Sequence, residues 1–263
     1  MGNFGPKHLT GLLWLFSLII ILLVLLLTIR NRRHYGVKYD KTVILITCLF
    51  IWGLEAVKTI YIFRSEAYSG DGNYPSYMMP FHICSMALYA FPILASSHDK
   101  LAEFVKPFAF AVMLLMTSII LVIPDSSGIM GSEPNWRFTF LNILPFQSFL
   151  YHGSLVFVPL YMVLSGFYRP RIRDIWKAFI VLIVVACFAF CLNKLLRTDF
   201  MTLEYGNGNP FQWLLQENYA LYLLLLFSVS TGGTGVVLGT ADFLVSLREK
   251  KQARLETPGI LNT

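Results

Sequence analysis

Long apolar runs alternate with short polar connections along the whole chain. A helix needs about 20 mostly apolar residues to cross the hydrocarbon core of a bilayer. Seven runs reach this length and predict seven membrane-spanning helices, at residues 9–29, 42–63, 77–97, 104–123, 147–166, 175–195 and 219–246. The pattern therefore predicts an all-α, polytopic membrane protein, built as a seven-transmembrane-helix bundle.

Composition indicates lipid as the solvent of this chain. Of its 263 residues, 56% are hydrophobic and 14% charged, whereas soluble domains have about 45–50% apolar and about 25% charged residues. We expect one transmembrane domain over residues 1–247 and a flexible cytoplasmic tail over 248–263. The first run lacks a small-residue cleavage site, so it is expected to be a retained anchor and not a signal peptide.

The distribution of basic residues predicts the orientation. The connections near residues 30–41, 98–106 and 167–177, together with the tail after 247, hold most of the 21 Lys and Arg residues. Connections rich in Lys and Arg stay in the cytoplasm. The amino end is therefore predicted outside and the carboxyl end inside. The net charge of +6 is explained by topology and anionic headgroups, and no nucleic-acid partner is expected.

Cys84 and His152 are the first candidates for chemistry, because polar residues inside spans are costly and are retained for function. Both lie near the outer end of their spans, and Cys84 is expected about 10 Å deep. Gly153 would let a helix or a ligand approach His152. His82 lies two residues before Cys84, and on a regular helix the two would face different sides.

Further polar candidates lie in the second and sixth spans. Glu55 and Lys58 are spaced i,i+3, and either form an intrahelical ion pair or line a polar cavity. Asn193 lies near the outer end of the sixth span, and Asn207 and Asn209 follow in the next loop. Their amides either cap helices or bind substrate by donating to an oxyanion.

A Cys–His pair suggests nucleophilic catalysis, because an imidazole can take the thiol proton and leave a thiolate that attacks an acyl carbonyl. In the structural alternative, the cysteine packs as a small apolar residue and the histidine forms a hydrogen bond between helices. No zinc-ligand spacing or disulfide framework is present, so neither a metal nor a cofactor is expected. Among the aromatics, Tyr151, Tyr161, Trp213 and Tyr219 are expected to anchor the chain at the interface.

Four short motifs resemble a known family. They are FHIC at 81–84, FLYHGSLVFVPLYMV at 149–163, LNKLL at 192–196 and GNGNP at 206–210. The first resembles the LHxC signature of YwaF-type bacterial integral membrane proteins, which are related to the transmembrane protein 164 acyltransferases of animals. The resemblance covers roughly half of the chain.

The resemblance implies an enzyme that moves a fatty acyl chain from a phospholipid to a lysophospholipid without acyl-CoA. In that case Cys84 would be the nucleophile and His152 the base, and His82 would orient the thiol or the carbonyl. The partners would be membrane lipids, with no protein partner predicted, and the location the bacterial cytoplasmic membrane. Acyl hydrolysis is the related possibility.

Two other functions fit a polar membrane bundle. A transporter or a small-molecule binder would line a path with ionisable groups at several depths, whereas these cluster in the outer half. A receptor-like seven-helix module fits the topology, but the outer connections lack a pair of cysteines for a disulfide.

Overall fold

Helices account for every regular element in the described residues of the computed structural model, which are 6–64, 76–96, 99–122, 143–206 and 209–256. Six of them are long and apolar enough to cross a membrane: Leu9–Arg32, Val37–Arg64, Lys100–Leu121, Phe146–Leu164, Ile172–Leu196 and Tyr219–Ala253. The predicted all-helical, multi-pass membrane protein is confirmed.

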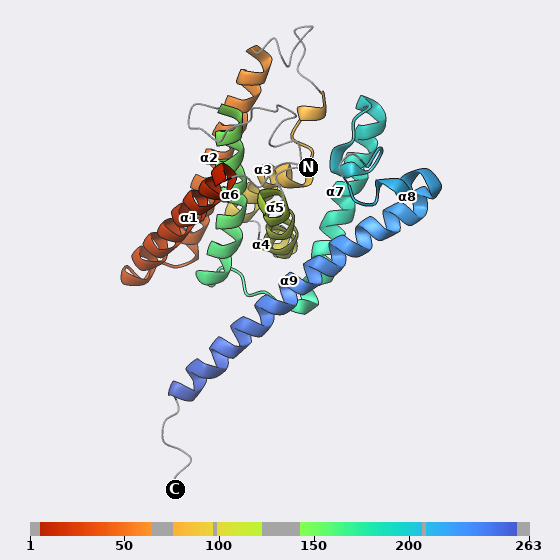
Figure 1. Ribbon diagram of the computed structural model, residues 1–263. Coiled ribbons are helices and arrows are strands. Elements are labelled where there is room, and N and C mark those ends of the chain that lie inside the picture. The colour runs from red at the N-terminus through yellow and green to blue at the C-terminus, as the bar shows by residue number, and fades with distance from the viewer. Residues whose placement is uncertain (1–5, 65–75, 97–98, 123–142, 207–208, 257–263) are drawn as a thin grey trace.

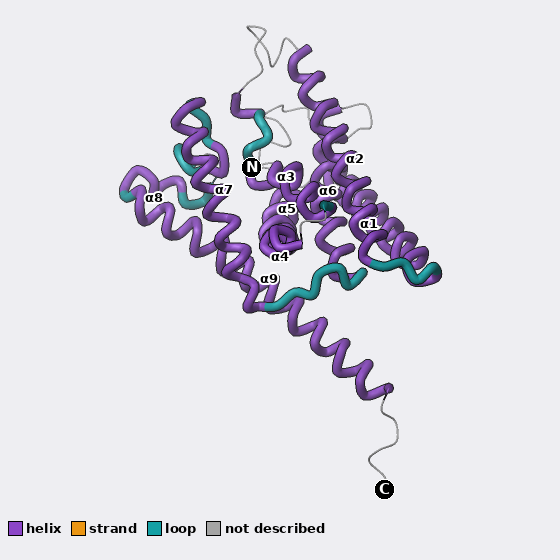
Figure 2. The backbone as a smooth tube through the Cα atoms, turned by 180° about the vertical axis from the view of Figure 1, so that it is seen from behind, coloured by secondary structure: helices purple, strands orange, loops and turns teal. Residues whose placement is uncertain are grey.

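The helices form three groups in space (Figure 1). Their bounds are α1 Pro6–Arg32, α2 Val37–Arg64, α3 Ala87–Ala95, α4 Asp99–Pro107, α5 Met113–Val122, α6 Ile143–Leu164, α7 Ile175–Leu196, α8 Gln212–Glu217 and α9 Tyr219–Glu256. Helices α1, α2 and α6 pack together, α3 to α5 lie at the centre, and α7 to α9 form the other side. The opposite view shows the same grouping (Figure 2).

One predicted span, residues 77–97, is not a continuous helix. Two 3₁₀ turns, Ser76–Met78 and Ile83–Met86, precede the nine-residue α3. Pro80 explains the break, because proline lacks an N–H and disfavours helical backbone in the residue before it. The helical part, Ile83–Ala95, rises about 20 Å and is too short by itself for a hydrocarbon core of about 30 Å. The prediction of one regular helix here is wrong.

A second proline, Pro92, leaves a carbonyl without a donor inside α3. Proline cannot donate to the carbonyl four residues earlier, and that carbonyl belongs to Leu88. The indole Nε1–H of Trp52, on α2, donates to the Leu88 oxygen at 3.0 Å. An unpaired carbonyl is costly in lipid, so this bond between α2 and α3 replaces the one that Pro92 removes.

A buried ion pair ties α1, α2 and α6 together at the other end of the bundle. The Asp40 carboxylate is fully buried and accepts two bonds from the Arg30 guanidinium, at 2.7 and 3.0 Å. The Tyr161 hydroxyl donates to the same carboxylate at 2.8 Å. Tyr161 is itself buried, so it packs inside the bundle and does not face lipid headgroups as the predicted interface anchor would.

The last helix is longer than the sequence predicted. Helix α9 continues past residue 247 to Glu256, so the first part of the predicted flexible tail is helical, and residues 257–263 lie outside the described part. Its 38 residues span about 57 Å, well beyond a core of about 30 Å. The carboxyl-terminal part of α9 projects beyond the other helices (Figure 1).

The Trp52 bond can be tested by a double-mutant cycle with Pro92. Trp52→Phe keeps an aromatic ring but leaves the Leu88 carbonyl unpaired, which should cost about 1 kcal/mol in the free energy of unfolding. Pro92→Ala restores an N–H for the same carbonyl, so Trp52→Phe should cost less in that background. Equal costs in both backgrounds, measured by denaturation in mixed micelles, would contradict this account.

The buried ion pair predicts a large effect at Asp40. Asp40→Asn leaves the Arg30 guanidinium without its counter-ion, and the free energy of unfolding should fall by about 3 kcal/mol. Lys38→Gln is the matched control, since Lys38 is an exposed charge on the same helix and its loss should change stability little. If both variants unfold alike in mixed micelles, the carboxylate does not hold the three helices.

Candidate functional site

Cys84 lies on the 3₁₀ turn Ile83–Met86, which packs against α3 and α5. The residue is 6% exposed. The Thr117 side chain of α5 lies beside the thiol, and its buried hydroxyl has no hydrogen bond of normal geometry within the described chain. The thiol is therefore held inside the bundle with one polar neighbour that is free to bond.

Helix α6 contacts Cys84 through Tyr151. The Tyr151 hydroxyl donates to the Cys84 carbonyl at 3.4 Å, and the phenol also approaches the side chain of Ser85. Tyr151 is buried, so its predicted role as an interface anchor is wrong. The contact joins the FHIC and YHG motifs, which are far apart in the sequence, at one level of the bundle.

His152 follows Tyr151 on α6 and has a fixed tautomer. Its Nδ1 lies 2.8 Å from the Ser148 carbonyl oxygen, and a carbonyl can only accept, so Nδ1 carries the proton. Nε2 therefore keeps its lone pair and can accept a proton. In the described chain no hydrogen bond joins this imidazole to the Cys84 thiol, so the pair shares a region without direct contact.

His82 faces away from the thiol. Its backbone is extended, with φ −72° and ψ 159°, and the residue is exposed where Cys84 is buried. The Nε2–H donates to the Tyr77 carbonyl at 3.2 Å, and the ring meets the Phe200 ring edge-on at 5.2 Å. The regular helix for which His82 and Cys84 were expected to face different sides is absent here, because His82 precedes an irregular turn.

Glu55 and Lys58 form the ion pair that their spacing predicted, with Lys58 Nζ 2.5 Å from Glu55 Oε1. Both side chains are largely buried on α2. The Lys58 charge acts on the imidazoles of both His82 and His152. The Lys58 ammonium is therefore near both imidazoles, while Glu55 balances its charge.

Asn193 organises the chain after α7. Its Nδ2 donates to the Phe200 carbonyl at 3.0 Å, and its Oδ1 accepts from the Phe200 N–H at 2.7 Å and from the Thr198 hydroxyl at 3.0 Å. The side chain is buried. Because Phe200 packs on His82, Asn193 positions the loop that covers this imidazole.

Asn209 has a smaller, local role. Its Oδ1 accepts from the Phe211 N–H at 2.9 Å, and its Nδ2 donates to the Thr202 hydroxyl at 3.4 Å. These bonds shape the turn before α8 and do not reach Cys84 or His152. The other predicted loop amide, Asn207, lies outside the described residues.

Gly153 allows α1 to approach α6 beside His152. A Cβ at this position would lie 2.4 Å from a methyl carbon of Leu15, which is buried on α1. The predicted close approach of a helix at Gly153 is confirmed.

Three groups of the site were missed in the sequence: Thr117, Ser148 and the hydrogen-bonding role of Tyr151. A lone threonine in an apolar span carries no signal, and the Ser148 contact uses a backbone carbonyl, which every residue has. Within the described ranges, no three His, Cys, Asp or Glu side chains come together as metal ligands would.

Comparison with known proteins shows the family of this chain. The model of the TMEM164 family matches residues 3–235, which include all the motifs that suggested the resemblance. A search of curated proteins and a search of solved structures give no significant match.

The two asparagines of the loop region make a matched pair for a stability test. Asn193→Ala leaves the buried Phe200 N–H and the Thr198 hydroxyl without their acceptor and should lower the free energy of unfolding by about 2–3 kcal/mol. Asn209→Ala removes bonds in a partly exposed turn and should cost about 1 kcal/mol or less. Thermal unfolding in detergent measures both, and equal losses would contradict the anchoring role of Asn193.

Proposed function

The chain belongs to the TMEM164 family, and from this premise we propose that it is a membrane-embedded acyltransferase. It moves a fatty acyl chain from a phospholipid to a lysophospholipid through an acyl-cysteine on Cys84, without acyl-CoA. The observation that carries the proposal is the bond from Tyr151 to the Cys84 carbonyl. It brings a buried thiol and an imidazole with a free Nε2 to one level of the bundle.

The first half of the reaction loads the cysteine. His152 Nε2 takes the thiol proton, and the Cys84 thiolate attacks the carbonyl carbon of the ester. The ester C–O bond breaks, and the departing lysophospholipid oxygen takes the proton from the imidazolium. The thiol and the imidazole do not touch in the structure, so we propose that the bound acyl chain turns the thiol from Thr117 toward α6.

The second half transfers the acyl chain to the acceptor. The acceptor hydroxyl gives its proton to His152 Nε2 and attacks the thioester carbonyl. The C–S bond breaks, and the Cys84 thiolate takes the proton back from the imidazolium, which restores the starting enzyme. The Thr117 hydroxyl lies beside the cysteine and supplies a donor for the oxyanion, while Tyr151 keeps its bond to the Cys84 carbonyl. With water as acceptor the same steps would give hydrolysis.

Lipid recognition is proposed for the charged pair on α2. The Lys58 ammonium lies toward the outer end of that helix and would attract the phosphate of the substrate headgroup, while Glu55 holds the lysine in place. His82 and Asn193 would hold the loop at Phe200 in place, since His82 contacts the Phe200 ring and Asn193 bonds the Phe200 backbone. We propose that the lipid enters beside this loop.

The proposed topology has seven crossings, with the amino end outside and the carboxyl end in the cytoplasm. Helix α2 leaves the end of the bundle that holds Asp40, whereas Lys106 of α4 packs on Phe167 just after α6 at that same end. This supports a return across the bilayer between α2 and α4, and we propose the irregular segment with α3 as the seventh crossing. The proposed location is the bacterial cytoplasmic membrane.

Transfer in proteoliposomes tests the role of Cys84. With a phospholipid labelled in its acyl chain and an unlabelled lysophospholipid, Cys84→Ala should abolish the appearance of label in the acceptor lipid. Cys48→Ala is the matched control, because Cys48 is also a buried cysteine but lies away from the site on α2. His152→Gln should lower the rate by about 100-fold or more.

Transfer at the wild-type rate by a folded Cys84→Ala protein would remove the acyl-cysteine mechanism. Equal losses in the Cys84→Ala and Cys48→Ala proteins would also contradict it, because a packing defect would then explain both.

A further inference from the structure

A cavity of about 460 Å³ lies at the end of the bundle opposite Cys84, between α4, α7 and the chain that joins α6 to α7. Tyr151 of α6 lies at the level of Cys84. The connection to α7 begins after Leu164, about 20 Å further along α6. Five cations line the cavity: Lys106, Arg169, Arg171, Arg173 and Lys177.

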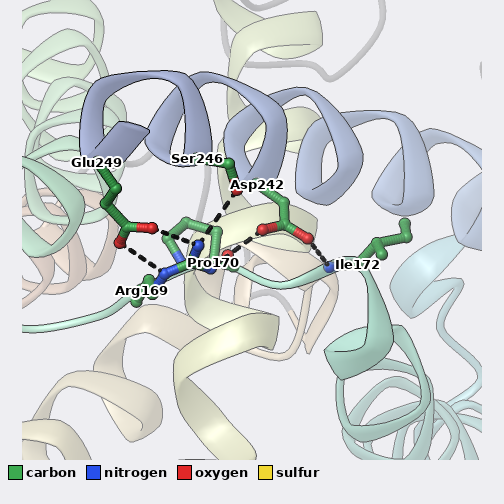
Figure 3. A network of polar contacts seen from close by, with 6 residues as sticks. All are labelled: Arg169, Pro170, Ile172, Asp242, Ser246 and Glu249. Carbon is green, nitrogen blue, oxygen red and sulfur yellow. Dashed lines mark hydrogen bonds and ion pairs between the residues drawn. The ribbon is translucent and has the colours of Figure 1, made fainter. Parts of the chain in front are cut away.

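Three of these cations already have partners. Figure 3 shows the Arg169 guanidinium directed at α9, where it donates to Asp242 at 3.0 Å, Ser246 at 3.2 Å and Glu249 at 2.8 Å. These bonds raise the pKa of Arg169, with the hydrogen bond to Glu249 as the largest cause. Lys106 pairs with Glu103, and Lys177 pairs with Asp174.

The pairing uses every carboxylate that faces the cavity. Glu103 and Asp174 are the two in its lining, and each holds one of the lysines. Asp242 holds Arg169 and also accepts the Ile172 N–H at 3.1 Å (Figure 3). Arg169 alone pairs with two carboxylates, Asp242 and Glu249, so the five cations of the cavity face four acids and one positive charge is in excess.

Arg171 and Arg173 are the cations that remain. Both are exposed, and neither makes an ion pair within the described part of the chain. They flank Ile172 on the short strap that enters α7 and line the cavity. The charge of Arg171 also acts on the Asp242 and Glu249 carboxylates, which Arg169 already bonds.

A third unused donor lines the same cavity. Tyr168 is 5% exposed, and its hydroxyl lies beside the Asp174 carboxylate without a hydrogen bond of normal geometry within the described chain. Burial raises the pKa of Tyr168, so the phenol stays protonated and can donate. The hydroxyl has the Asp174 carboxylate as a neighbouring acceptor, and it can turn to donate to an incoming phosphate oxygen.

The surroundings place the cavity at the level of lipid headgroups. The Trp176 side chain is half exposed and meets Phe104 edge-on at 5.4 Å, and aromatic rings of this kind gather at the membrane interface. Basic pockets between helices on the cytoplasmic side suit anionic headgroups, and guanidinium groups match the geometry of phosphate oxygens.

We propose that this cavity binds a phosphate anion, which Arg171, Arg173 and the Tyr168 hydroxyl hold together. The phosphate of an anionic phospholipid and free inorganic phosphate share this chemistry. The site is separate from the proposed acyl-transfer site, so it would bind lipid in the other leaflet as a structural or regulatory ligand.

The test compares the full-length protein in nanodiscs of phosphatidylcholine alone and with phosphatidylglycerol added. Binding of the anionic lipid to the folded state should raise the unfolding temperature. Arg171→Gln with Arg173→Gln should weaken this binding about tenfold or more. Arg32→Gln with Arg33→Gln is the matched control, because it removes two exposed arginines from the neighbouring connection at the same end of the bundle.

Tyr168→Phe separates binding from folding. It removes only the hydroxyl, so the unfolding temperature in neutral discs should match the wild type while the effect of phosphatidylglycerol shrinks. A second arm adds inorganic phosphate to neutral discs, with chloride at equal ionic strength as the reference. Stabilisation by free phosphate that is lost in the arginine variant supports the site with a soluble ligand as its source.

Two results would overturn the proposal. One is an equal rise in unfolding temperature on adding phosphatidylglycerol in the Arg171, Arg173 variant, the wild type and the Arg32, Arg33 control. The other is a wild-type protein that responds to neither anion. Both outcomes are independent of acyl transfer, so they leave the role of Cys84 untouched.

Discussion

Backbone carbonyls within a bilayer must be hydrogen-bonded, and the irregular segment before and within α3 meets this demand with side chains. Trp52 donates to the Leu88 carbonyl and His82 to the Tyr77 carbonyl, where a regular helix would have used its own N–H groups. The Cys84 carbonyl accepts the Ala87 N–H and takes a second bond from Tyr151. The break at the prolines therefore requires α2 to pack where its donor can reach the segment, and α6 adds a contact to the turn before α3.

The same packing fixes the candidate site. Tyr151 cannot reach the Cys84 carbonyl unless α6 lies against the turn, and His152 then lies beside it with Nδ1 committed to a carbonyl. At the opposite end, Asp40 ties α6 to α1 and α2. Helix α6 is thus held at both ends, so the level of the imidazole relative to the thiol is set by the fold and not by the loops.

Hydrophobic length predicted most of the fold, because the cost of lipid exposure acts on every residue of a span. The i,i+3 spacing of Glu55 and Lys58 predicted their ion pair, because it depends only on neighbouring turns of one helix. The failures are non-local. A tyrosine in an apolar span looks like an interface anchor until a partner far along the chain is known, as Asp40 is for Tyr161. The shared level of Cys84 and His152 was predictable from helix depth, whereas their lack of contact depends on side-chain rotamers that no sequence pattern records.

The acyl-cysteine itself gives the most direct measurement. Wild-type protein incubated with phospholipid and no acceptor would be digested, and the peptide that contains Cys84 analysed by mass spectrometry before and after hydroxylamine. The account predicts the added mass of a fatty acyl chain on that peptide, removed by hydroxylamine as a thioester must be. Transfer that proceeds while Cys84 stays unmodified, or an acyl chain found instead on Cys187 or Cys191, would contradict it.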